Sequence, residues 1–274
     1  MLKIIFLADI VGKIGRKAVE KYLPMLVKQY QPDLVIANAE NLAHGIGFTQ
    51  KTLDEMRDAG VTLFTSGNHA WAKGKADEVL NQTDPVIIRP ANYPQKKSGQ
   101  GMKILANSDS KSLASKIGQK KLVVVNLQGR VFMKEKVACP FKTLERLVKD
   151  HPKDIILVDF HAEATSEKTA LAEYFDGRVS AVIGTHTHVP TADERILDKG
   201  TAYITDAGMV GYYHSIIGAA KEQIFNLFLD TGKSSQKHDL PETGEVQFNG
   251  IYLEINPKTR KANKIKRLEK IIKI

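Results

Sequence analysis

The stretch Val61–Trp71, VTLFTSGNHAW, changes character halfway along its length. Its first residues favour a buried β-strand, whereas Ser66 and Gly67 favour a turn that leads into Asn68 and His69. In open α/β sheets, ligands bind beyond the carboxyl ends of the strands, so an amide and an imidazole at such an end indicate a functional site. Other apolar runs of this chain end in the same way, which links the fold to its chemistry.

Apolar runs of strand length alternate with amphipathic runs of helix length along most of the chain. The strand-like runs are rich in Val and Ile and lack polar alternation, which is typical of strands covered on both faces. They are residues 3–10, 32–41, 61–68, 85–92, 121–129, 154–163, 180–188 and 201–208. The helical patterns are residues 15–30, 49–60, 75–82, 141–150 and 166–177. This alternation predicts an α/β fold, with helices covering two sheets or one wide sheet.

The last part of the chain departs from this alternation. From about Val246, two strand-like runs flank an Asn-Pro-Lys-Thr turn, which predicts a closing β-hairpin. The polar segment 107–121 has few order signals, so we expect a loop between strands. Thr49 and Ser166 stand where helix N-caps are expected. The length of 274 residues fits a single domain over residues 1–274 that includes the C-terminal hairpin.

The composition is that of a globular protein in a reducing compartment. Hydrophobic residues make up 42% of the chain and charged residues 26%. Cys139 is the only cysteine, which excludes an intrachain disulfide and a thiol-based metal or redox centre, so we expect a cytoplasmic protein. Asp9 interrupts the N-terminal apolar run, which does not resemble a secretion signal. No segment approaches the roughly 20 apolar residues of a membrane span.

The net charge is +9, and much of it lies in the C-terminal segment PKTRKANKIKRLEKIIKI. A solvated basic surface accounts for most of this excess, and it also attracts anionic substrates. RNA stays open as an alternative partner.

Polar side chains follow the predicted strands at five places. These endings supply carboxylates, amides and imidazoles without any thiolate, and they are Asp9, Glu40-Asn41, Asn68-His69, His161, and His186 with His188. Such a set suits two divalent cations held by oxygen and nitrogen. Mn or Fe is favoured by the mixture of carboxylate, amide and imidazole, and Zn is also compatible with it. A carboxylate such as Glu40 can bridge two ions, with Asp9 on one and Asn68 on the other.

Each ending by itself has an ordinary structural explanation. Asp9 can cap the following helix, Glu40-Asn41 can cap a loop, and His161 can be a half-buried histidine with a hydrogen-bond partner. The His186-Thr187-His188 motif is more specific, because two imidazoles so close together would repel one another when protonated unless a metal keeps them neutral. All the endings together favour a metal site.

The chain resembles the calcineurin-like metallophosphoesterase superfamily in its GNH after a strand, a single downstream His and the later GTHTH. The blocks DIVG, NAEN, SGNHAW, VDFHAEATSEK, GTHTHVPTAD and TDAGMVG are similar to its bacterial YmdB-type branch. The resemblance implies a layered α/β/β/α sandwich of two mixed sheets flanked by helices. It also implies a 2′,3′-cyclic nucleotide phosphodiesterase, and it leaves a homo-oligomer open.

The resemblance also implies the two ligand sets. One ion would take Asp9, Glu40, Asn41 and His188, and the other would take Glu40, Asn68, His161 and His186, with His69 unliganded beside them. The chain departs from the superfamily's usual Asp-x-His, because it reads Asp-Ile-Val at its first block, and it has Glu in place of the usual bridging Asp. The YmdB-type branch shares both changes. The sequence GYYH, which ends on His214, is a further departure and puts specificity near that loop in question.

The expected chemistry is in-line hydrolysis of a phosphodiester by a hydroxide that bridges two metal ions. The departing ribose oxygen needs a proton, and His69, next to the predicted ligand Asn68, is the expected general acid.

Two other functions stay open. A phosphomonoesterase or nucleotidase would use the same metals, since both reactions attack phosphorus. A regulatory RNA-binding protein with mainly structural metals would fit the basic C-terminus, although RNP-like aromatic patterns are absent from the sequence. A Rossmann protein is the weakest alternative, because HGIGFT lacks the third glycine of the dinucleotide fingerprint.

The other singled-out residues receive structural interpretations. His44 is expected at the surface or at the rim of the substrate pocket, and His151 and His238 are expected to be exposed to solvent. Met209 is expected in the core.

Overall fold

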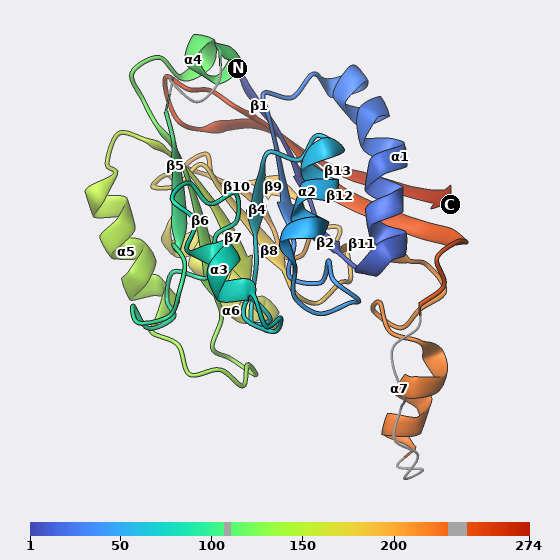
Figure 1. The fold of residues 1–274 in the computed structure, drawn as a ribbon. Coiled ribbons are helices and arrows are strands. Elements are labelled where there is room, and N and C mark those ends of the chain that lie inside the picture. Colours follow the sequence, from blue (N-terminus) through green and yellow to red (C-terminus); the bar gives the residue numbers. More distant parts are fainter. Residues whose placement is uncertain (107–110, 230–239) are drawn as a thin grey trace.

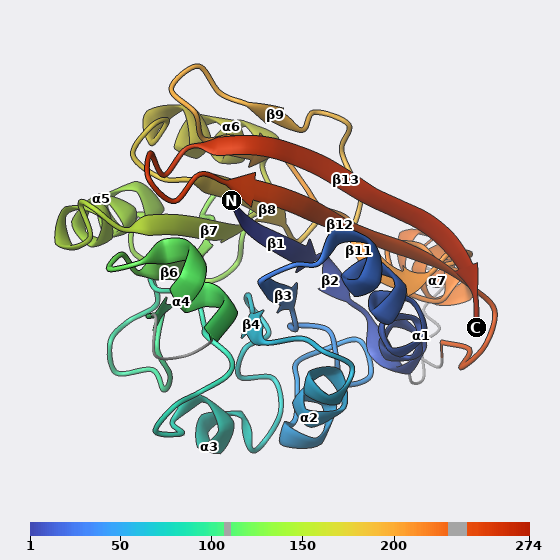
Figure 2. The same ribbon diagram turned by 90° about the horizontal axis from the view of Figure 1, so that it is seen from above.

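The computed structural model describes residues 1–106, 111–229 and 240–274. These residues form two mixed β-sheets that pack face to face, with helices on both outer sides (Figures 1 and 2). Helices α1 (Gly12–Tyr30) and α2 (Gln50–Asp58) cover one side, and α5 (Pro140–Asp150) and α6 (Thr165–Tyr174) cover the other. The predicted layered α/β/β/α fold with two sheets is confirmed.

The first sheet has the strand order β2-β11-β12-β1-β3-β4, with β13 paired to β12. Its strands are β1 (Leu2–Leu7), β2 (Asp9–Ile10), β3 (Leu34–Asn38), β4 (Leu63–Thr65), β11 (Met209–Tyr212), β12 (Glu245–Ile255) and β13 (Ala262–Lys273). β1, β3 and β4 run parallel, whereas β12 pairs antiparallel with β1, β11 and β13. The predicted C-terminal hairpin is thus β12–β13, and β12 lies within the sheet. The single-domain organisation stays a prediction.

The second sheet has the order β5-β6-β7-β8-β10-β9. Its strands are β5 (Met102–Leu105), β6 (Leu122–Gln128), β7 (Ile155–His161), β8 (Ala181–Thr185), β9 (Arg195–Ile196) and β10 (Ala202–Ile204). β6, β7, β8 and β10 are parallel, so their carboxyl ends share one edge.

Strands covered on both faces explain the continuous apolar runs of the sequence. In β1, Ile4 and Phe6 face the core between the sheets, whereas Ile5 and Leu7 face the core beneath α1. A third core lies between the second sheet and helices α5 and α6, and it includes Val125. Met209 is buried, as predicted.

The segment 107–121 corrects one prediction. It was expected to be a loop, but helix α4 (Lys111–Ile117) lies within it, while residues 107–110 fall outside the described part of the chain. Leu113 and Ile117 are four residues apart and therefore share a helical face, which packs against the core between the sheets. Tertiary burial of this short apolar face overrides the polar composition of the segment.

The predicted strand over residues 85–92 is also wrong. This segment makes only an isolated bridge, in which Ile87 pairs with Phe64 of β4. Pro85 and Pro90 flank the bridge, and proline has no N–H to donate to a ladder, which is one physical reason why no strand extends there.

Helix ends were predicted with mixed success. Thr49 caps α2, since its side chain accepts a hydrogen bond from Thr52 N. Ser166 is not a cap: α6 begins at Thr165 after Ala164, which makes no side-chain cap.

The expected exposure of His151 is wrong, because its side chain is only 11% exposed and Nδ1 lies 3.0 Å from Asp154 Oδ2. His238 lies outside the described residues.

Two helices remain: α3 (Ala76–Leu80) and α7 (Lys221–Phe228). α7 projects from the body of the molecule in Figure 1. Among the described residues, a helix that combines the length and the apolar character needed to cross a membrane is absent.

Candidate metal centre

The segments that follow β3, β4, β7 and β8 meet between the two sheets. Glu40 comes two residues after β3, Asn68 comes three residues after β4, His161 ends β7, and His186 follows β8. The shared edge of parallel strands brings residues together that are far apart in the sequence.

His161 Nε2 is the point on which several donor atoms converge. It lies 3.0 Å from Glu40 Oε2, 3.2 Å from Asn68 Oδ1 and 3.1 Å from His186 Nδ1. One ligand atom each of Glu40, His161 and His186 lies within 4.8 Å of the others. A carboxylate oxygen, an amide oxygen and two imidazole nitrogens at such separations surround the space of a small cation.

His188 marks the second half of the cluster. Its Nε2 lies 3.0 Å from the Asn41 side-chain amide and 3.8 Å from Asp9 Oδ1. Asp9 is fully buried and its Oδ2 accepts a hydrogen bond from His186 N, but Oδ1 has no hydrogen-bond partner among the described residues. A buried carboxylate oxygen without a partner is costly, so this geometry fits a cation beside Asp9 and His188.

Gly67 is required by the close approach of two site residues. A Cβ atom at this position would lie 2.1 Å from Glu40 Oε2 and 2.3 Å from His161 Nε2. The glycine before Asn68 therefore makes room for the side chains that meet behind it. This explains why the Val61–Trp71 stretch turns on a glycine before its polar end.

The cluster is electrostatically unusual. Burial opposes ionisation of Glu40, but His161 and His69 outweigh it and hold the pKa of this carboxyl well below its usual range. Burial also opposes protonation of His161, yet the carboxylates of Glu40 and Asp9 raise its pKa to about 9. Burial and the neighbouring His161 lower the pKa of His186 to about 3. The carboxylates thus favour a positive charge at His161, and a bound cation would replace this proton, since an imidazole that binds a metal is neutral, as His186 already is.

A hydrogen-bonded chain behind His161 was not predicted. His161 Nδ1 lies 2.9 Å from Thr185 Oγ1, which donates to Asp159 Oδ1 at 2.7 Å. Asn38 donates to the other oxygen of Asp159 at 3.0 Å. These contacts fix the ring so that Nε2 points into the cluster. The only sequence signal was the strand ending Asp159-Phe160-His161, in which Asp159 and His161 share one face.

His69 lies at the edge of the cluster. Its Nδ1 is 3.2 Å from Glu40 Oε1, and its side chain is 37% exposed. Contact with Glu40 raises the pKa of His69, because it favours the imidazolium form.

A cleft of about 420 Å³ opens beside this edge of the cluster. Its lining includes Asn41, His69 and His188, together with Lys13 and Arg16 from α1. His44 was expected at the surface or at the rim of the substrate pocket. Its side chain is exposed and also lines this cleft. His214 does not line this cleft; it pairs with Glu245 at 2.7 Å.

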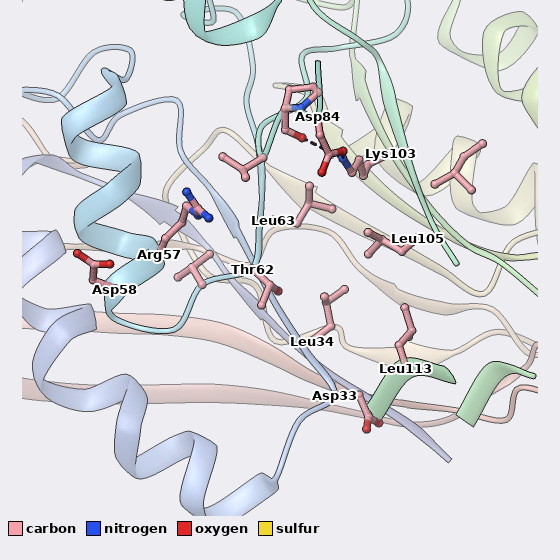
Figure 3. Close-up of a pocket in the computed structure, with 14 residues that line it drawn as sticks. Asp33, Leu34, Arg57, Asp58, Thr62, Leu63, Asp84, Lys103, Leu105 and Leu113 are labelled. Carbon is pink, nitrogen blue, oxygen red and sulfur yellow. Dashed lines mark hydrogen bonds and ion pairs between the residues drawn. The ribbon is translucent and has the colours of Figure 1, made fainter. Parts of the chain in front are cut away.

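A larger cavity of about 650 Å³ lies at the opposite ends of the strands (Figure 3). It is lined by Leu34 and Leu63, the first residues of β3 and β4, and by Leu113 of α4. Its charged side chains include Asp84 and Lys103, which pair with each other. The lining contains none of the predicted site residues, so this cavity is separate from the cluster.

Three comparisons relate the chain to known proteins. Residues 5–268 match the family described as YmdB-like protein. The 2′,3′-cyclic-nucleotide 2′-phosphodiesterase of Bacillus subtilis (strain 168) is 41% identical over 274 residues, which cover 97% of this chain and 96% of that protein. A putative phosphatase/phosphodiesterase of Mycoplasma pneumoniae is 41% identical over 271 residues, which cover 96% of this chain and 91% of that protein.

A solved structure agrees with these relationships. The crystal structure described as a novel phosphatase from Mycoplasma pneumoniae has a TM-score of 0.88 and 38% identity to this chain. The match covers 98% of this chain and 93% of that one. The chain therefore belongs to the YmdB-like family of metallophosphoesterases, and it is a hydrolase.

Proposed function

We propose that the chain hydrolyses 2′,3′-cyclic nucleotides at the cluster between its two sheets, with two divalent ions bound there. The observation that carries the proposal is the convergence of Glu40, Asn68 and His186 on His161 Nε2, all within 3.0–3.2 Å. The substrate class rests on the name of the Bacillus subtilis relative.

One ion would be held by Glu40, Asn68, His161 and His186, and Glu40 would bridge to the other. The second ion would be held by Asp9, Asn41 and His188 together with Glu40. We propose iron or manganese, with zinc compatible, because the ligands combine hard oxygens with imidazoles. When bound, such a pair of ions activates water and stabilises the charge on the phosphate.

His69 is the proposed general acid. It lies beside Glu40, but its side chain is partly exposed and lines the cleft, so its ring can reach a bound substrate. A protonated imidazole can donate its proton to the departing ribose oxygen, which leaves poorly as an alkoxide. Contact with Glu40 favours this protonated form.

One basic side chain of the cleft fits an anionic substrate. Lys13 projects from the first turn of α1 into the lining, whereas Arg16 is largely buried and pairs with Glu55 at 2.6 Å. Lys13 also pairs with Glu242 across the cleft at 2.7 Å, and both side chains are more than half exposed. An exposed pair is weak in water, so a phosphate can compete for Lys13.

A substrate panel tests the proposal. Purified protein loaded with Mn²⁺ would be given 2′,3′-cyclic nucleotides, 3′,5′-cyclic nucleotides and phosphomonoesters, and elemental analysis would count the metal. We expect two ions per chain and the highest kcat/KM for the 2′,3′-cyclic class. A preference for monoesters would favour a phosphatase, as the name of the Mycoplasma pneumoniae relative allows. Salt-sensitive RNA binding without hydrolysis of any ester would favour the RNA-binding alternative.

A further inference from the structure

The turn that carries His186 and His188 has a strained backbone. The φ angles of these two residues are 101° and 64°, in a region that side-chain-bearing residues seldom occupy. Such conformations are unfavourable and persist only where surrounding contacts hold them. The contacts of the intervening Thr187 therefore help to hold the backbone from which both imidazoles project.

Asp206 supplies that contact from the neighbouring strand. It follows β10, and its Oδ2 accepts a hydrogen bond from Thr187 N at 3.1 Å, while Oδ1 accepts one from Gly208 N at 2.9 Å. The backbone of Asp206 also binds the chain after the turn, since its N donates to Thr191 Oγ1 at 2.9 Å and its carbonyl accepts from Thr191 N at 3.0 Å. Asp206 thus binds both the middle of the turn and the chain that follows it.

A buried lysine holds this carboxylate in place. Lys168 Nζ, from α6, lies 2.7 Å from Asp206 Oδ2, and the two side chains are 0% and 1% exposed. A Cβ atom on Gly184 would lie 3.0 Å from Lys168 Cδ and 1.7 Å from the backbone oxygen of Thr205, the residue before Asp206. Gly184 therefore allows Lys168 and the backbone of Thr205 to approach the His186–His188 turn closely.

An ion pair as deeply buried as this one is weak evidence for stability, because two apolar side chains often serve as well. The role of the Lys168–Asp206 pair is therefore better explained by the groups that it orients. We propose that Asp206, anchored by Lys168, is a positioning residue that holds the His186–His188 turn in the geometry required for metal binding. This inference rests on the proposed function, and it adds two residues that do not touch the metals.

The test is the binding of Mn²⁺ to the purified protein, measured by calorimetry, in wild type and in the double variant Lys168→Met with Asp206→Ala. The double variant leaves no buried charge unpaired, but it removes the acceptor for Thr187 N. We expect it to fold and to bind Mn²⁺ at least about tenfold more weakly, as loss of outer hydrogen-bond partners typically does. If it fails to fold, Lys168→Met with Asp206→Val, which fills more of the space, decides by the same measurement.

Asp176 provides a matched control at the other end of β10. It is buried, and its carboxylate accepts hydrogen bonds from Lys199 N and Thr201 N at 2.8 and 3.2 Å. Asp176→Ala should lower the Tm but leave the Kd for Mn²⁺ within about twofold of wild type. The inference is overturned if the folded double variant binds Mn²⁺ like wild type, or if Asp176→Ala weakens binding equally. A wild-type protein that binds no Mn²⁺ would instead overturn the proposed function.

Discussion

Around His161 three donor atoms converge on one buried nitrogen, whereas His188 lies at the edge of a cleft and its Nε2 has only the Asn41 amide at 3.0 Å and Asp9 Oδ1 at 3.8 Å. The His161 side chain is 0% exposed and has three donor atoms within 3.2 Å. The His188 side chain is 12% exposed, and Asp9 Oδ1 stands 3.8 Å from it. This enclosed half, which comprises Glu40, Asn68, His161 and His186, is built by residues from both sheets. Thr185 and Asp159 hold the His161 ring from behind, whereas the His186 side chain is 22% exposed.

This difference separates two tasks. The half around His161 can hold its ion more firmly, because Thr185 and Asp159 fix the His161 ring from behind and Glu40 is buried. The open half adjoins the cleft through Asn41 and His188, where a substrate has to approach. We therefore expect the two ions to differ in affinity, with the tighter one beside His161.

The largest expected effect comes from breaking the enclosed half. His161→Ala removes the nitrogen on which the other donors converge, so the ion there should be lost and kcat/KM should fall about 10⁴-fold or more, since a catalytic metal contributes several kcal/mol. Metal content and cyclic nucleotide hydrolysis measure this. His151→Ala is the control, because His151 precedes the start of β7, whereas His161 ends that strand, and it pairs with Asp154. Two retained ions in the His161 variant would contradict the assignment.

The next largest effect concerns His69, which lies at the edge of the cluster and lines the cleft. His69→Ala should retain both ions but reduce kcat by about 10²–10⁴-fold, the usual contribution of a general acid. Rate measurements with a substrate whose leaving group needs no proton provide the control, since such a substrate should lose much less. A parallel loss of metal would make His69 a ligand and contradict its role as an acid.

Breaking the open half should have a more selective effect. Asp9→Asn keeps the shape of the side chain and removes its charge, so the ion beside His188 should bind about 10–100-fold more weakly while the ion beside His161 stays. A Mn²⁺ titration of this variant should resolve two unequal sites. Full occupancy with full turnover in Asp9→Asn would be inconsistent with a ligand at this position.

The smallest expected effect sharpens the comparison without removing a donor. In Gly67→Ala the added methyl group would press on Glu40 and His161 of the enclosed half, and overpacking of this kind costs about 1–3 kcal/mol. We expect a lower Tm and weaker binding of the tighter ion. Gly74→Ala is the matched control, because nothing lies within 4 Å of a Cβ atom built there. Equal Tm losses in both variants would mean that the close approach at Gly67 is unimportant.

Sequence patterns predicted the strands whose ends carry the cluster, because apolar runs and polar endings are local features. They failed at α4, where Leu113 and Ile117 are buried by a core formed from distant strands. They failed again at residues 85–92, where an apolar run makes only a bridge. Both errors concern segments whose conformation depends on which neighbour packs against them.

The predicted site residues are brought together in space, and their roles as ligands and acid stay predictions. The residues that orient the predicted ligands could not be predicted from sequence patterns alone. Asp159 and Thr185 orient His161 only because β7 and β8 are adjacent and in register. Lys168 and Asp206 lie in two of the blocks that resemble the YmdB-type branch, but their pairing requires α6 to lie near the end of β10.

By itself, the sequence determined the alternation of strands and helices, the family resemblance and the kinds of donor atom at the strand ends. These properties depend on local periodicity and on side-chain chemistry. Only the tertiary structure decided that Glu40 meets His161 and His69 together, that one half of the cluster is enclosed, and that Asp206 ties down the histidine turn. Those facts depend on strand order and register, which bring together residues of different strands such as Glu40 and His161.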